Sequence, residues 1–155
     1  MNVSKFLKLE NAYAHCDVPC GIYDPHNAQI SAHTVIRMIN LMKALPKDDP
    51  DHDLKMSRYI AVKEEHGELV KHEIRILWGD YFKPDHQQQF PELTDLVWKV
   101  MKQGSAGRQT ADLAQAQALL DSVLKIAEIF WKTKGMTPRR MAAPYPSGGE
   151  IVLPS

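Results

Sequence analysis

Residues 113–130 read LAQAQALLDSVLKIAEIF, and this stretch indicates the fold class of the whole chain. Its apolar residues recur at steps of three and four, which places them on one face of an α-helix. That face consists of Leu113, Ala116, Leu120, Val123, Leu124, Ala127 and Phe130. Gly135 follows, and glycine commonly ends helices, so the pattern predicts a helix over residues 110–134.

Three segments upstream carry similar patterns. Two of them open with an Asp-Pro pair. This pair indicates the start of a helix, because aspartate caps a helix and proline is tolerated at the first helical position. The predicted helices span residues 24–45, 50–79, 91–103 and 110–134. Gly67 lies inside the second helix, where glycine costs about 1 kcal/mol relative to alanine, so a packing reason is expected. Gly104 is expected to end the third helix. The pattern predicts an all-α, antiparallel four-helix bundle over residues 24–134, and no β signal competes with it.

The chain of 155 residues is long enough for one domain with a substantial core. Its formal net charge is zero, so neither nucleic acid nor an anionic membrane surface is expected as a partner. No uninterrupted apolar stretch approaches the roughly 20 residues that a membrane span needs. Residues 135–155 contain four prolines and little periodicity. They are expected to form a C-terminal extension without a core of its own, disordered or lying across a neighbouring subunit.

Residues 1–14 indicate a segment that is removed from the mature protein. Lys5 and Lys8 are basic, and residues 12–14 read AYA, a small-residue pattern typical of cleavage sites. A secretory signal also needs an apolar run of about 7–15 residues, and here the run is only Phe6-Leu7. We therefore expect a cytoplasmic protein with a cleavable pro-segment and a processing protease as partner. A plain flexible leader is the alternative.

Residues 15–25 read HCDVPCGIYDP and contain both cysteines of the chain. If the mature chain begins at His15, its α-amine, the Cys16 amide nitrogen and the Cys16 thiolate can close two five-membered chelate rings. Cys20 returns through the Pro19 turn and adds a second thiolate. Two nitrogens and two sulfurs in a plane suit a d⁸ ion such as Ni(II), and the imidazole remains available as an axial ligand. From the residues alone, a metal-binding hook, a redox pair and incidental cysteines all stay open.

The stretch HCDVPCGIYDP closely resembles the N-terminal nickel hook of the nickel superoxide dismutases, whose mature chain starts at the histidine. Residues 77–84, LWGDYFKP, resemble the loop after that family's second helix, and residues 129–134, IFWKTK, resemble the end of its last helix. The resemblance covers about residues 14–134. It implies an oxidoreductase that disproportionates superoxide to dioxygen and hydrogen peroxide at a Ni(II)/Ni(III) centre in a nickel hook over residues 15–23.

The resemblance also implies the site residues. The nickel ligands would be the amine and imidazole of His15, the amide and thiolate of Cys16, and the thiolate of Cys20. Tyr23 would lie beside the open face of the metal and Tyr81 would line the pocket, both as catalytic residues. Without the family, buried aromatic rings with satisfied hydroxyls would explain both tyrosines.

Three further positions concern how the hook is held. Asp17 matches the family's hook aspartate, whose role there is conformational. Ser31 and His66 stand where the family pattern has a glutamate and an arginine that orient the axial imidazole. Ser31 can hydrogen-bond without charge, and a histidine does not carry the permanent charge of an arginine. A structural core histidine is the alternative interpretation of His66. By resemblance, the protein is expected to form a homohexamer with the hooks near neighbouring subunits.

Two other function classes remain as alternatives. A non-catalytic nickel- or copper-binding module would use the same hook for storage or delivery. A helical interaction protein would use Cys16 and Cys20 only as a redox pair. Glu68, His72 and Glu73 hint at a carboxylate metal site within the bundle, but a solvated helix face explains them better.

Overall fold

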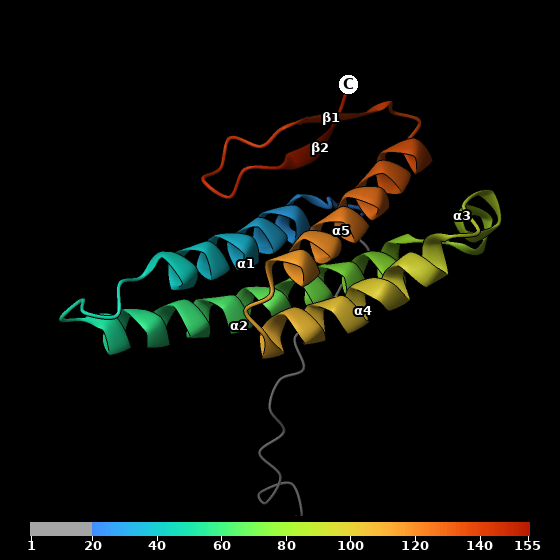
Figure 1. Cartoon of the computed structure of the whole chain (residues 1–155). Helices are drawn as coiled ribbons and strands as arrows, with labels where there is room; N and C mark the ends of the chain where they lie inside the picture. The colour runs from blue at the N-terminus through green and yellow to red at the C-terminus, as the bar shows by residue number, and fades with distance from the viewer. Residues whose placement is uncertain (1–19) are drawn as a thin grey trace, which may run out of the picture.

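The computed structural model describes residues 20–155. Four long helices run alongside one another in this part of the chain, as Figure 1 shows. They are α1 (His26–Ala44), α2 (His52–Ile76), α4 (Leu93–Gln109) and α5 (Leu113–Thr133). The smaller elements are η2 (Leu77–Tyr81), α3 (Pro84–Gln89), β1 (Pro138–Ala142) and β2 (Glu150–Pro154). The prediction of a helical bundle is confirmed. None of the helices within residues 20–155 is long and apolar enough to cross a membrane.

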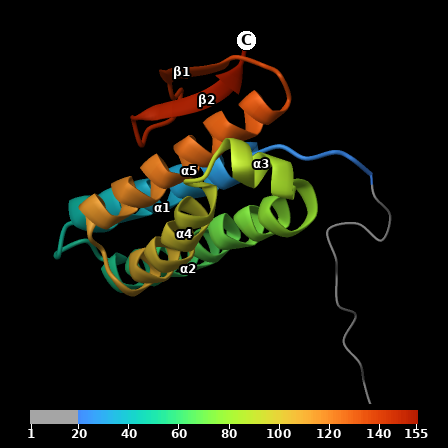
Figure 2. The same ribbon diagram turned by 90° about the vertical axis from the view of Figure 1, so that its right-hand side faces the viewer.

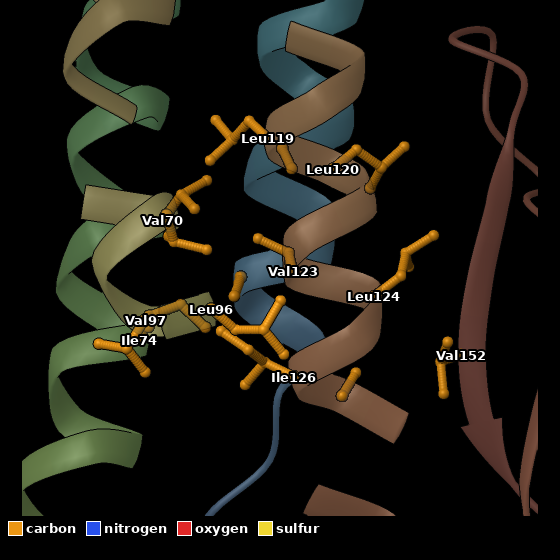
Figure 3. Packing of buried hydrophobic residues seen from close by; sticks show 14 of the residues in the cluster. Val70, Ile74, Leu96, Val97, Leu119, Leu120, Val123, Leu124, Ile126 and Val152 are labelled. Atoms are coloured by element: carbon orange, nitrogen blue, oxygen red, sulfur yellow. The ribbon is translucent and has the colours of Figure 1, made fainter. Parts of the chain in front are cut away.

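Helix α5 forms the centre of the core. Figure 3 shows one side of it facing Val70 and Ile74 of α2, while Leu120 and Leu124 lie toward the strand that carries Val152. The predicted apolar face is therefore buried, but the buried surface of α5 is wider than one stripe. The additional buried residues are Leu119, Ser122, Ile126 and Ile129. A helix that is covered on two sides buries more than the single stripe of a surface helix.

The C-terminal segment differs from the expectation. Strands β1 and β2 pair in antiparallel register from Pro138↔Pro154 to Ala142↔Glu150, and the hairpin packs on the outer side of α1 and α5 (Figure 2). Val152 is fully buried. The absence of β-structure was thus a wrong prediction. The paired prolines stand at the ends of the strands, where a missing N–H does little harm to the ladder.

Helix α4 continues to Gln109, so the predicted stop at Gly104 was wrong. This glycine serves close packing instead, because a Cβ added to it would lie 2.8 Å from Cγ of Lys71. A Cβ on Gly67 of α2 would lie 2.5 Å from Cγ of Arg108. The two glycines let α2 and α4 cross closely, which confirms that Gly67 has a packing reason.

The end of α4 is stabilised from α2 by a buried lysine. The Lys63 ammonium donates hydrogen bonds to the backbone carbonyls of Gly107, Arg108 and Thr110. These carbonyls lie at the C-terminal end of α4, where the last C=O groups of a helix have no intrahelical N–H donor. Helix α5 then begins at Leu113 rather than at residue 110, with Asp112 accepting a hydrogen bond from the Ala114 N–H at 2.8 Å.

Candidate metal centre

Cys20 lies in the short segment that leads into α1. Gly21 follows with a φ of +71°, a left-handed conformation that glycine adopts without strain. The Ile22 N–H points at Cys20 Sγ with a nitrogen–sulfur distance of 3.5 Å. A backbone N–H donor favours an anionic sulfur, and the thiolate is the form that binds metals. The predicted ligands His15 and Cys16 lie outside the described residues.

The same holds for Asp17 and for the proposed pro-segment, residues 1–14. Among the predicted ligands, only Cys20 belongs to the described part of the chain. Its sulfur is a soft donor of the kind that nickel accepts in sites rich in thiolate. The local donor chemistry therefore fits the implied metal.

Tyr81 is positioned by a local change in helix geometry. After α2, the segment Leu77–Tyr81 forms one turn of π-helix, and the Phe82 N–H donates to the Leu77 carbonyl at 2.9 Å. A π-turn adds one residue to the helical turn and changes the direction of the following side chains, which is common at functional sites. The structure then brings Tyr81 against Tyr23, with ring centroids 5.5 Å apart.

Further aromatic rings surround Tyr81. Phe130 lies 4.6 Å and Phe82 5.2 Å from it between centroids, and His86 stacks on it at 5.6 Å. The ammonium of Lys134 lies 4.8 Å from the Tyr81 ring centroid. The stretches 77–84 and 129–134, far apart in sequence, thus meet at the end of the bundle where the chain enters α1 (Figure 2).

Thr133 and His86 belong to this cluster and were not predicted. The Tyr81 hydroxyl lies 2.7 Å from Thr133 Oγ1. Thr133 lies in the stretch IFWKTK at residues 129–134, so that motif was the signal from which it could have been identified as a site residue. His86 lies in the segment expected as a connecting loop, which instead forms the short helix α3. Nothing in the local pattern marks His86 as a neighbour of Tyr81.

Ser31 and His66 lie on neighbouring helices. Ser31 is buried on α1 and His66 is partly buried on α2. The Nδ1 atom of His66 is buried without a hydrogen-bond partner among residues 20–155. Most buried polar side-chain atoms have such a partner.

The alternative carboxylate site in the bundle does not form within residues 20–155, where no group of three or more His, Cys, Asp or Glu side chains could hold a metal ion. Glu68 instead receives hydrogen bonds from Arg75 at 2.8 Å and Arg108 at 2.7 Å. The hydrogen bond from Arg75 holds the pKa of the Glu68 carboxyl below its usual range. These residues form a surface ion-pair network.

Comparisons with known proteins agree with this geometry. The nickel-containing superoxide dismutase family matches residues 10–134 of the chain. The nickel superoxide dismutase of Streptomyces coelicolor is 43% identical over 121 residues, which cover 78% of this chain and 88% of that protein. The enzyme of Streptomyces seoulensis is 42% identical over 121 residues, with the same coverage of both chains.

Solved structures are similar over the same range. A native nickel superoxide dismutase superposes with a TM-score of 0.70 at 42% identity, covering 77% of this chain and 99% of that chain. A second structure, with nickel ligation corresponding to the oxidised state, gives a TM-score of 0.69 at 42% identity, covering 78% and 99%. The family match includes the hook sequence, the tyrosine pair and the end of α5, and it stops before the hairpin. By sequence and by fold, the chain belongs to the nickel-containing superoxide dismutase family.

Proposed function

We propose that this protein is a superoxide dismutase, which converts two superoxide anions and two protons to dioxygen and hydrogen peroxide. The observation that carries the proposal is the position of Cys20 and Tyr23 directly before α1, with Tyr23 against Tyr81, inside the segment that the family matches. A site that joins a thiolate donor to ordered tyrosines at one end of a rigid bundle suits redox chemistry on a small anion.

The residues that would hold nickel are His15, Cys16 and Cys20. His15 would supply its amine and imidazole, Cys16 its amide nitrogen and thiolate, and Cys20 its thiolate. When bound, the nickel ion supplies a one-electron couple that oxidises one superoxide and reduces another. The anionic sulfur and amide nitrogen of these ligands would stabilise the oxidised metal, and the Cys16 amide would have to give up its proton for the metal to bind.

The chain itself supplies the rest of the site. The Ile22 N–H donates to Cys20 Sγ and would favour its thiolate form. Tyr23 would order water beside the hook, and solvent would provide the two protons of the reaction. The ammonium of Lys134, held over the Tyr81 ring, adds positive potential where an anion must arrive.

We also propose that His66 helps to hold the His15 imidazole. The buried Nδ1 of His66 has no polar partner among residues 20–155, and the His15 imidazole would supply one. Ser31, on the neighbouring helix, would contribute a neutral hydrogen bond in place of the family's carboxylate. Asp17 would support the conformation of the hook.

Processing and assembly complete the proposal. Removal of residues 1–14 by a protease would free the His15 amine, since a peptide nitrogen is a poor donor with a planar bond. We propose that the protein is cytoplasmic and that it forms a homohexamer, the assembly that the resemblance implies. Large apolar side chains at the surface support an oligomer: Ile22 is 76% exposed and Trp98 63% exposed.

The test compares the full-length chain with one that begins at His15. Each is given nickel under reducing conditions, and superoxide decay and metal content are measured. Activity is expected only in the shorter chain. Equal activity in both would show that the amine is not a ligand, and tight nickel binding without superoxide decay would indicate the storage module instead.

A further inference from the structure

The hydrogen bond between Tyr81 and Thr133 has a direction that the surrounding atoms determine. Thr133 Oγ1 lies 2.7 Å from the Phe130 carbonyl oxygen and 2.7 Å from the Tyr81 hydroxyl. A carbonyl oxygen only accepts, and a threonine hydroxyl carries one proton. The proton between Thr133 and Phe130 must therefore be that of Thr133. The proton between Tyr81 and Thr133 must then come from Tyr81.

This assignment changes what Tyr81 offers to its other neighbours. Its phenol has a single proton, and Thr133 receives it. Toward any further group, the Tyr81 oxygen presents only lone pairs. The packed rings of Phe130 and His86 hold the Tyr81 ring in place, so the phenol stays beside Thr133.

We propose that Thr133 is a positioning residue for superoxide dismutation, which makes Tyr81 a hydrogen-bond acceptor at the site. The proposal rests on the function proposed above. An acceptor does not bind the superoxide anion directly, because both oxygens repel. It orients a water molecule instead, by accepting a hydrogen bond from one of its O–H groups, and the second O–H group of that water donates a hydrogen bond to the anion. No bond is broken in this arrangement, and the protons consumed still come from solvent.

The direction of the hydrogen bond is tested without nickel. Ultraviolet resonance Raman spectra of tyrosine contain a Fermi doublet whose intensity ratio distinguishes a phenol that donates from one that accepts. The wild-type spectrum minus that of Tyr81→Phe isolates Tyr81. We expect a donor signature in wild type and in Thr133→Ser, and its loss in Thr133→Val, which has a similar size but no hydroxyl. An acceptor signature in wild type, or no change in Thr133→Val, would overturn the proposal.

The effect on the reaction is measured with nickel-loaded protein that begins at His15. Thr133→Val is expected to lower kcat/KM about fivefold, the effect of one neutral hydrogen bond, and Thr133→Ser to restore it to within about twofold. Circular dichroism establishes that each variant is folded. Full activity in folded Thr133→Val would refute the positioning role and leave the dismutase function intact. A wild type without dismutase activity would refute the function, and the positioning role with it, whatever the Raman result.

Discussion

His33 joins the family bundle to the hairpin through both of its ring nitrogens. Nε2 lies 2.9 Å from the Glu150 carbonyl oxygen, and because a carbonyl only accepts, Nε2 carries the proton of the neutral ring. Nδ1 then accepts from the Ser147 hydroxyl at 2.9 Å. Burial lowers the pKa of His33 from its ordinary value of 6.5, and the hydrogen bond to Glu150 offsets this only in part. Nδ1 accepts a hydrogen bond only in the neutral imidazole, so the contact of His33 with the hairpin depends on pH.

This histidine predicts how stability responds to acid. With a lowered pKa in the folded state, the unfolded chain binds more protons in the range between the two values, so the free energy of unfolding increases there as the pH rises. The contribution of His33 is complete above pH 6.5 and is lost as the pH falls from 6.5 to the folded-state pKa. Urea unfolding of wild type and His33→Gln over this range is the measurement. Parallel pH profiles of the two proteins would contradict the prediction.

Cys20 carries a second prediction at the residue scale. Cys20→Ser should abolish nickel-dependent dismutase activity, because a hydroxyl does not replace a thiolate donor. The bundle should stay folded, with stability within about 0.5 kcal/mol of wild type, since Cys20 is only partly buried and precedes α1. The same result is expected for Cys16→Ser. Metal analysis and circular dichroism accompany the superoxide assay, and a loss of helicity would show that the cysteine is structural.

Helices whose apolar residues repeat over many turns could be predicted from the sequence. Features that depend on a residue far away in the sequence could not. The stripe of α5 identified a helix and most of its buried face. Gly104 was ambiguous, because glycine can end a helix or permit close packing, and only the position of α2 decides between them. The hairpin was missed because its strands are short and its prolines suggest a loop. Tyr23 and Tyr81 were found through motifs, whereas the role of Thr133 depends on a side chain 52 positions away.

The crossing of α2 and α4 predicts opposite effects for two glycine substitutions. Gly67→Ala gains about 1 kcal/mol of helix propensity, but its Cβ would displace Arg108 from Glu64 and Glu68. Overpacking of this kind costs about 1–3 kcal/mol, so a net loss of about 1 kcal/mol is expected from these two terms.

Gly107→Ala is the matched control on α4. Beyond its chain neighbours and the nearby backbone of α4, no atom of the described chain lies within 4 Å of the Cβ it would add, so a gain of up to about 1 kcal/mol in helix propensity is expected. Thermal unfolding of both variants measures the difference. If Gly67→Ala were the more stable of the two, the close crossing would not be what requires glycine at position 67.

At the scale of the whole molecule, the chain combines a family bundle with a hairpin that the family match does not include. Residues 10–134 match the family, and strands β1 and β2 follow directly. The hairpin nevertheless belongs to the same core, because Val152 is fully buried and its backbone exchanges two hydrogen bonds with the buried side chain of Gln29, at 2.7 and 3.1 Å. It covers the face of α1 and α5 away from α2 and α4 (Figure 1). The candidate site residues therefore lie in the stretch that matches the family, while the hairpin adds to the core that stabilises the bundle. The two parts divide these roles.

This division predicts the result of removing residues 136–155. The truncated chain loses the burial of Ile151 and Val152, at about 1.5–3 kcal/mol each, and leaves Gln29 and His33 without their hairpin partners, so stability should fall by at least about 3 kcal/mol. Nickel-dependent activity per folded molecule should remain, because the hook, the tyrosine pair and Thr133 all precede the cut.

Arg139→Ala, which changes an exposed residue of β1, serves as the control and should alter stability by less than about 0.5 kcal/mol. Denaturant unfolding and superoxide decay are measured on the same preparations. A truncated protein as stable as wild type would show that the hairpin is dispensable for the core, and one that folds but loses activity would place the hairpin in the active site rather than on the back of the bundle.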